Sequence, residues 1–338
     1  MLSRVAESLY WMNRYIERAE NVARFVGVNQ DLSLGRFGEQ GIQWSSLIKA
    51  SGDQKLFEQH YDSPSEQNVL EFLIFDRRNR NSILCCTEAA RENGRKVRET
   101  LSTAMWQALN RFYLRVEAAA KDRQSILRRP HRFLDDVKDS SHLLLGVSEA
   151  TFSHGEAYNF LRLGRLLERA DKTSRILDVK YFLLLPRPTD VGTPLDAVQW
   201  TALLNSTSAL AMYRRRYGTI VPKQVAEFLI LDRFFPRSIY HAVTGAERAV
   251  HEITGVSRDR YSNPAEQHLG KLRYELTFQG IDDIIAVGMH QFVDSVQERL
   301  NKIGEEIYRT FFARPSPTSH PSSSETGSSQ RQSQSSAT

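Results

Sequence analysis

Charged side chains that recur at helical spacing are the residues of this sequence that could do chemistry. Twice in the chain an arginine is followed three residues later by Glu-Arg-Ala, and another arginine lies seven residues after that glutamate. With 3.6 residues per turn, these positions fall on one stripe of a helix. Such a stripe could bind an anionic ligand or use its carboxylate as an acid or base. The two stripes are Arg14, Glu17, Asn21 and Arg24, and Arg165, Glu168, Lys172 and Arg175.

The glutamate and the arginine of each Glu-Arg pair need separate partners. Sequence neighbours lie about 100° apart around a helix, so they cannot form an ion pair with each other. A merely solvated helix face is the alternative interpretation, but such a face has no reason to repeat its charges in both halves of the chain. We therefore expect Glu17, Arg18, Glu168 and Arg169 to point into a shared interior or cleft, where they bind each other or a ligand.

The chain contains an internal repeat. The segment Glu71–Arg77 recurs as Glu227–Arg233, and Trp44 recurs as Trp200, at the same offset of 156 residues. The Glu-Arg pairs recur at an offset of 151, so one connection differs in length by five residues. Self-similarity of this kind predicts tandem units of related structure. We expect one unit over about 1–150 and the other over about 153–312.

Two more sets of repeated residues are candidates for a site. The tryptophan that repeats between the units either lines a pocket or, as is more usual on a helix, packs in the core. The Asp-Arg pair of each unit closes an apolar helix, where the aspartate opposes the helix dipole and needs a specific partner. That partner is either a structural one, such as an arginine of the stripes, or a ligand. These residues are Trp44 and Trp200, Asp76 and Arg77, and Asp232 and Arg233.

The apolar pattern predicts an all-α fold. Each unit begins with a long helix whose apolar residues recur every three or four positions, which is the seam expected for packing against another helix. Further helices are expected at about 42–51, 65–77, 81–93, 95–121 and 130–150, with matching ones in the second unit. No two-residue alternation bounded by hairpin turns indicates a sheet. The seams are Val5, Leu9, Met12, Ile16, Ala19, Ala23 and Val26, and Phe160, Leu163, Leu167, Ala170 and Leu177.

Two segments interrupt this helical pattern. Three prolines and a glycine predict a loop over 186–194, because they cannot continue a helix. The stretch 313–338 is rich in serine, glutamine and proline and is expected to be a disordered tail. The domain is therefore expected to span 1–312 as two pseudo-symmetric helical units packed into one bundle.

Composition limits the class of protein. The 338 residues are 41% hydrophobic and 25% charged, which suits a folded domain. No apolar run approaches the length of a membrane span and no secretion signal is visible, so we expect a cytoplasmic protein. The adjacent Cys85 and Cys86 suit neither a disulfide framework nor a metal knuckle, and Glu-x-x-His pairs are missing. We predict no metal and no cofactor.

Other kinds of site have weaker signals. Phosphate-binding glycine loops and nucleophile elbows are absent from the sequence. Cys85 could be a nucleophile, but the second unit repeats no partner for it. The segment Tyr213–Tyr217 contains three arginines and could bind nucleic acid, although packed tyrosines beside a solvated basic turn fit better, because the first unit keeps the aromatics without the charge.

The N-terminal residues, Leu2–Arg24 with Glu17-Arg18 at their centre, resemble the opening of the alpha-E domain family of bacterial helical proteins, and Glu168-Arg169 repeats the motif. The resemblance covers about 1–312. It implies an association with circularly permuted ATP-grasp ligases, and hence a role in an amide-forming or peptide-modifying system.

From this resemblance we expect an accessory or substrate-binding partner of an ATP-grasp-type ligase, which binds the enzyme or its peptide or amino-acid substrate. An enzyme of the same pathway, with Glu17 or Glu168 as acid or base, is the alternative. Arginine beside a carboxylate lowers its pKa, which suits a ligand clamp better than a proton donor. Nucleic-acid binding is a weaker third interpretation.

Overall fold

The computed structural model describes residues 1–34, 40–183 and 194–313, and the side chains of 1–30, 44–178 and 196–313. Helices make up its regular structure, and no strand occurs in these ranges. The helices of the first half are α1 (Ser3–Leu34), α2 (Gln40–Ser51), α3 (Gln54–Glu58), α4 (Glu66–Ile74), α5 (Ile83–Lys96), α6 (Thr103–Lys121), α7 (Arg123–Arg128) and α8 (His131–Thr151). Those of the second half are α9 (Glu156–Leu183), α10 (Pro194–Ser206), α11 (Leu210–Tyr217), α12 (Pro222–Leu231), α13 (Ile239–Thr254), α14 (Pro264–Phe278), α15 (Ile281–Val287) and α16 (Met289–Ile307), followed by a π-helical turn, η2 (Tyr308–Phe312). The all-α prediction is confirmed.

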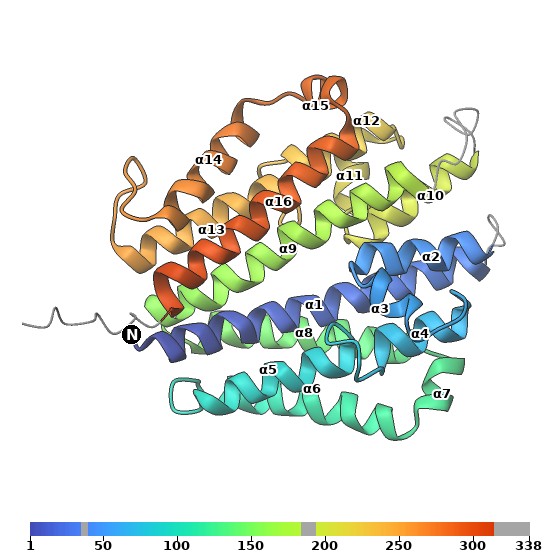
Figure 1. Cartoon of the computed structure of the whole chain (residues 1–338), viewed down its shortest axis with the longest axis horizontal. Helices are drawn as coiled ribbons and strands as arrows, with labels where there is room; N and C mark the ends of the chain where they lie inside the picture. Colours follow the sequence, from blue (N-terminus) through green and yellow to red (C-terminus); the bar gives the residue numbers. More distant parts are fainter. Residues whose placement is uncertain (35–39, 184–193, 314–338) are drawn as a thin grey trace, which may run out of the picture.

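Two long helices, α1 and α9, lie side by side through the middle of the molecule (Figure 1). Helices α5, α6 and α8 pack together on the α1 side, and α13, α14 and α16 pack together on the α9 side. A three-dimensional symmetry between the predicted units 1–150 and 153–312 stays a prediction of the sequence.

Capping side chains account for where several helices begin. Ser65 and Asn263 accept hydrogen bonds from backbone N–H groups of the first turn, as their positions in the sequence predict. Ser82 and Ser238 do the same for α5 and α13. The helix predicted over 95–121 is observed but begins later than expected, because α5 continues to Lys96 and Ser102 caps α6 after a short turn.

Both predicted seams are in the core. Every residue of the two seams is buried, apart from Val5, which is partly buried against the same cluster. One glycine lets the long helices come close: a Cβ on Gly164 of α9 would lie 2.2 Å from the carbonyl oxygen of Tyr10 on α1. Nearby, the Asn13 side chain donates a hydrogen bond to the Leu161 carbonyl at 3.0 Å. These contacts bring the Glu-Arg stripes of α1 and α9 together.

The predicted loop over 186–194 and the predicted tail over 313–338 lie almost wholly outside the described residues. Among the helices that the structure describes, none has the length and apolar character needed to span a membrane.

Candidate functional site

The two Glu-Arg pairs exchange partners across the contact between α1 and α9. The Arg169 guanidinium of α9 donates two hydrogen bonds to the Glu17 carboxylate of α1, at 2.9 and 2.8 Å. In the opposite direction, the Arg18 guanidinium of α1 donates two to Glu168 of α9, at 2.6 and 2.9 Å. Both carboxylates are buried, with 2% and 0% exposure. The expected inward orientation is therefore observed, and each glutamate is bound by the arginine of the other pair.

A second arginine completes the shell of each glutamate. Arg14 donates from Nε to Glu168 at 2.9 Å, on the same carboxylate that Arg18 holds. Arg237, which lies just before α13, donates to Glu17 at 3.0 Å. Because a buried carboxylate is costly unless it is paired and hydrogen-bonded, these shells are what allow the glutamates to stay ionised inside the molecule.

A third buried carboxylate, Glu20, extends the cluster along α1. It accepts hydrogen bonds from Arg24 of the same helix and from Arg237. Ser141 of α8 donates to Oε2 of Glu20 at 2.7 Å, and Nε2 of His142 lies 3.2 Å from Oε1. We call Glu17, Glu20, Glu168 and the five arginines 14, 18, 24, 169 and 237 the ion-pair cluster.

The arginines keep the three carboxylates ionised. Burial by itself raises the pKa of Glu17, but Arg169 and Arg237 outweigh it and lower the pKa below its ordinary value. Burial would also raise the pKa of Glu168, but Arg18 and Arg14 outweigh it and hold that pKa well below the usual range. The pKa of Glu20 is also held well below that range, since burial is outweighed chiefly by Arg237. These groups are anions at neutral pH and poor proton donors.

This ionisation predicts an acid-sensitive fold. Because the pKa of each glutamate is lower in the folded chain than the ordinary 4.5, its contribution to stability is fully present above pH 4.5. That contribution is lost as the pH falls through the folded-state values. Urea unfolding between pH 7 and pH 3 should show the free energy of unfolding falling below about pH 4.5. A Glu168→Gln variant should show a shallower fall, and an equally steep one would contradict this origin.

The other residues of the stripes lie around the cluster. Asn21 donates to Glu17 and accepts from Arg237 at 3.1 Å. Arg175 pairs with Asp171 at 3.0 Å, one turn away on α9. Arg165 lies 3.7 Å from Glu149 of α8, and burial together with the nearby Arg169 lowers its pKa. Of these three residues, only Asn21 makes hydrogen bonds to the cluster, while Arg165 and Arg175 lie beside other carboxylates.

The Asp-Arg pairs do not join the cluster. Asp76 accepts hydrogen bonds from Tyr61 at 2.8 Å and from Arg78, so the stripe arginine suggested as its partner is wrong. Asp232 pairs with Arg216 and accepts from the backbone N–H of Phe234 at 2.8 Å. Each aspartate therefore fixes the turn that follows its helix.

The remaining candidates are also structural or exposed. Arg77 pairs with Glu88 on the surface, and Arg233 lies over the ring of Tyr240. Trp44 and Trp200 are 2% and 1% exposed and belong to the core, as the more usual role of a helical tryptophan predicts.

Tyr213, in the basic segment of α11, is buried and donates to the Thr219 carbonyl. Its ring stacks on Tyr217 with centroids 5.0 Å apart, so Tyr213 is not free to stack on a nucleic-acid base. The Cys85 thiol lies 3.6 Å from the Arg77 carbonyl, while burial raises the pKa of Cys86 to about 12. Among the described residues, no group of three or more His, Cys, Asp or Glu is placed to hold a metal ion.

Sequence reasoning missed two members of the cluster, Glu20 and Arg237, and two residues near it, Asp171 and His142. Glu20 and Asp171 are both acidic at the same offset of 151, so the repeat could have identified them. Arg237 gave no such signal, because Asn81 occupies the equivalent position; there Asn81 accepts a hydrogen bond from Arg18 at 2.6 Å. His142 lies on α8, far from the stripes in sequence.

The chain also matches a known family of domains. A domain described as a predicted alpha-helical domain with a conserved ER motif, called Alpha-E, matches residues 1–312. The chain belongs to the Alpha-E family. Its two Glu-Arg pairs, one on α1 and one on α9, are the pairs that exchange partners in the ion-pair cluster.

Relatives of this Alpha-E chain are longer proteins. Uncharacterized proteins of Mycobacterium bovis and Mycobacterium tuberculosis are 21% identical to it over 271 residues. The match covers 75% of this chain but 30% of each relative, so the chain spans less than a third of their length. No solved structure matches the chain.

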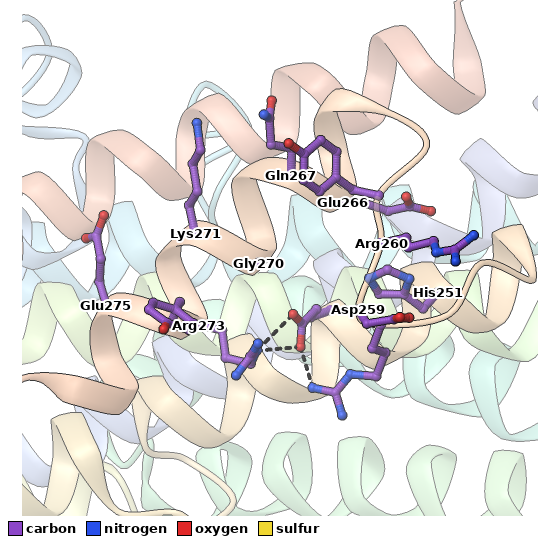
Figure 2. Close-up of a pocket in the computed structure, with 13 residues that line it drawn as sticks. His251, Asp259, Arg260, Glu266, Gln267, Gly270, Lys271, Arg273 and Glu275 are labelled. Atoms are coloured by element: carbon purple, nitrogen blue, oxygen red, sulfur yellow. Dashed lines mark hydrogen bonds and ion pairs between the residues drawn. The ribbon is translucent and has the colours of Figure 1, made fainter.

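Two pockets are candidates for a ligand site. One, of about 330 Å³, lies between α13, α14 and their connection (Figure 2). In its lining, the buried Glu247 carboxylate is paired with Arg273 and Arg258. Asp259 and Glu275 add negative charge around it, so its cations are largely balanced. The other, of about 500 Å³, lies beside the ion-pair cluster and includes Arg14.

Proposed function

We propose that this Alpha-E chain is the helical, non-catalytic partner of an ATP-grasp-type ligase that forms amide or peptide bonds. The observation that carries the proposal is the length of the relatives, in which the matched region is only 30% of the protein. A helical unit that is joined to further protein in one organism commonly works with a separate chain in another. The ligase class comes from the family resemblance of the Glu-Arg segments.

The geometry of the cluster supports a structural role for its carboxylates over acid–base catalysis. An acid or base must reach the reacting group, and its pKa should lie near the working pH. Glu17 and Glu168 are instead buried, fully engaged with arginines and held ionised. The cluster therefore locks α1 to α9, and the surface around it is left to bind a partner or its substrate.

Affinity purification from the native host tests this proposal. We expect a protein with an ATP-grasp fold to co-purify with the tagged chain in near-equal amounts, and an excess of untagged chain to displace it. ATP-dependent amide formation by that protein should increase when the chain is added. The chain alone should release no ADP from ATP in the presence of amino acids or peptides.

Two results would overturn the proposal. If no ATP-grasp protein co-purified from cells that express both the chain and such a ligase, the proposed partnership would be wrong. ATP-dependent ligation or amide hydrolysis by the chain alone would instead favour the enzyme alternative.

A further inference from the structure

The groove beside the ion-pair cluster has the size and lining of a small-molecule site. Its lining residues come from α1, α9, α16 and η2. Figure 1 shows α16 running beside α9 toward the end of the molecule where α1 begins. Arg14 and Asp171 supply charge to its lining, while Trp11 and the half-exposed Tyr308 supply aromatic surface. Its volume of about 500 Å³ is within the range of sites that hold small ligands.

Arg14 is held in place and still has donors to offer. Its Nε donates to Glu168 at 2.9 Å and one terminal nitrogen donates to the Tyr10 hydroxyl at 3.0 Å. Its guanidinium also lies over the Trp11 ring, 5.1 Å from the centroid. Within the described part of the chain, its other terminal nitrogen makes no hydrogen bond. Since a guanidinium has five N–H groups, several remain for a ligand on a side chain that is 18% exposed.

The acids in the groove disfavour a doubly charged anion. Asp171 is already paired with Arg175 at 3.0 Å and with Lys172 at 3.3 Å. Glu305, at the rim, pairs with Lys302 at 3.3 Å. A doubly charged phosphate would be repelled by both acids, whereas a carboxylate carries one charge and matches the planar fork of arginine.

The equivalent arginine of the second stripe offers no such site. Arg165 lies 3.7 Å from the Glu149 carboxylate, which also accepts a hydrogen bond from Tyr158 at 2.7 Å. A protein carboxylate therefore already stands beside Arg165. Arg14 also has a protein carboxylate beside it, Glu168 at 2.9 Å, but Arg14 lines the groove as well.

We propose that this groove binds the carboxylate end of an amino acid or short peptide, with the carboxylate on Arg14 and an apolar side chain between Trp11 and Tyr308. The proposal deepens the proposed function, since it rests on that function for its link to amide-forming chemistry. Its charge preference follows from the groove alone.

A pair of probes that differ only in charge tests the carboxylate. N-acetyl-phenylalanine and its neutral amide would be titrated into the full chain, with binding followed by ligand-observed NMR. We expect the carboxylate to bind at least about tenfold more tightly than the amide, as for a charge-assisted hydrogen bond. Arg14→Gln should abolish this preference, while the matched Arg165→Gln should keep it within about twofold.

A second pair of variants tests the groove in case Arg14→Gln fails to fold. A Cβ on Gly304 would have Arg14 as its nearest neighbour at 3.9 Å, so Gly304→Leu keeps α16 helical and fills the groove. Gly146, on the open face of α8, has nothing within 4 Å of such a Cβ and provides the control Gly146→Leu. Only Gly304→Leu should abolish the binding of N-acetyl-phenylalanine.

Two outcomes would overturn the proposal that the groove binds a carboxylate. One is equal binding of the acid and the amide to the unmodified chain, and the other is no binding of either at millimolar concentration. If co-purification of the ligase persisted in that case, the proposed function would stand and only the groove would be rejected.

Discussion

Replacing Glu168 with glutamine is expected to lower the free energy of unfolding by about 3–5 kcal/mol. Glutamine keeps the shape of the side chain but leaves Arg14 and Arg18 without the charge that both of them contact. Lys172, 3.7 Å from the same carboxylate, loses a partner as well. Removing one member of a largely buried ion pair is costly because the remaining charges lose their counterion where little water can replace it.

Urea unfolding of Glu168→Gln beside Glu88→Gln measures this effect. Glu88 pairs with Arg77 at 2.7 Å, but both side chains are largely exposed, so its loss should cost at most about 1 kcal/mol. Similar midpoints for the two variants would mean that the cluster contributes no more than a surface ion pair. The role given to it as the lock between α1 and α9 would then be wrong.

The second large effect is expected from a single methyl group. Changing Gly164 to alanine places a Cβ 2.2 Å from the Tyr10 carbonyl oxygen, a distance at which a backbone must move. Forcing atoms into a packed contact of this kind costs about 1–3 kcal/mol. Because the displaced element is α1, the change should also weaken the ion pairs between Glu17 and Arg169.

The matched change at Gly146 should have the opposite sign. That glycine lies in the exposed part of α8 with open space around it. There alanine should raise the free energy of unfolding by about 0.5–1 kcal/mol, since glycine is a poor residue within a helix. Thermal and urea unfolding of both variants would check the pair, and stabilisation by Gly164→Ala would exclude the close helix contact.

The ion-pair cluster and the groove are given separate roles, although Arg14 belongs to both. Glu17 and Glu168 are buried and are bound by arginines across the contact between α1 and α9. Arg14 is bound to the same cluster, yet it retains donors toward the groove. A cluster that fixes this arginine rigidly would lower the entropy lost when a ligand binds.

Local sequence patterns were sufficient for the helices and for the inward position of the stripes. The seam from Leu9 to Val26 is buried because residues three and four apart share one face of a helix, whatever lies opposite. The repeat of Glu17-Arg18 at Glu168-Arg169 indicated that these charges have partners. The break before α6 was missed, since only the capping side chain of Ser102 marks it.

The pairing itself was decided by the tertiary structure. Arg169 binds Glu17 and Arg18 binds Glu168 because α1 and α9 pack closely at Gly164, a contact between residues about 150 positions apart in the chain. Arg237 enters from the turn before α13, where the sequence repeat has Asn81. Periodicity specifies which face of a helix is buried, but which charge meets which depends on how distant helices are placed against one another.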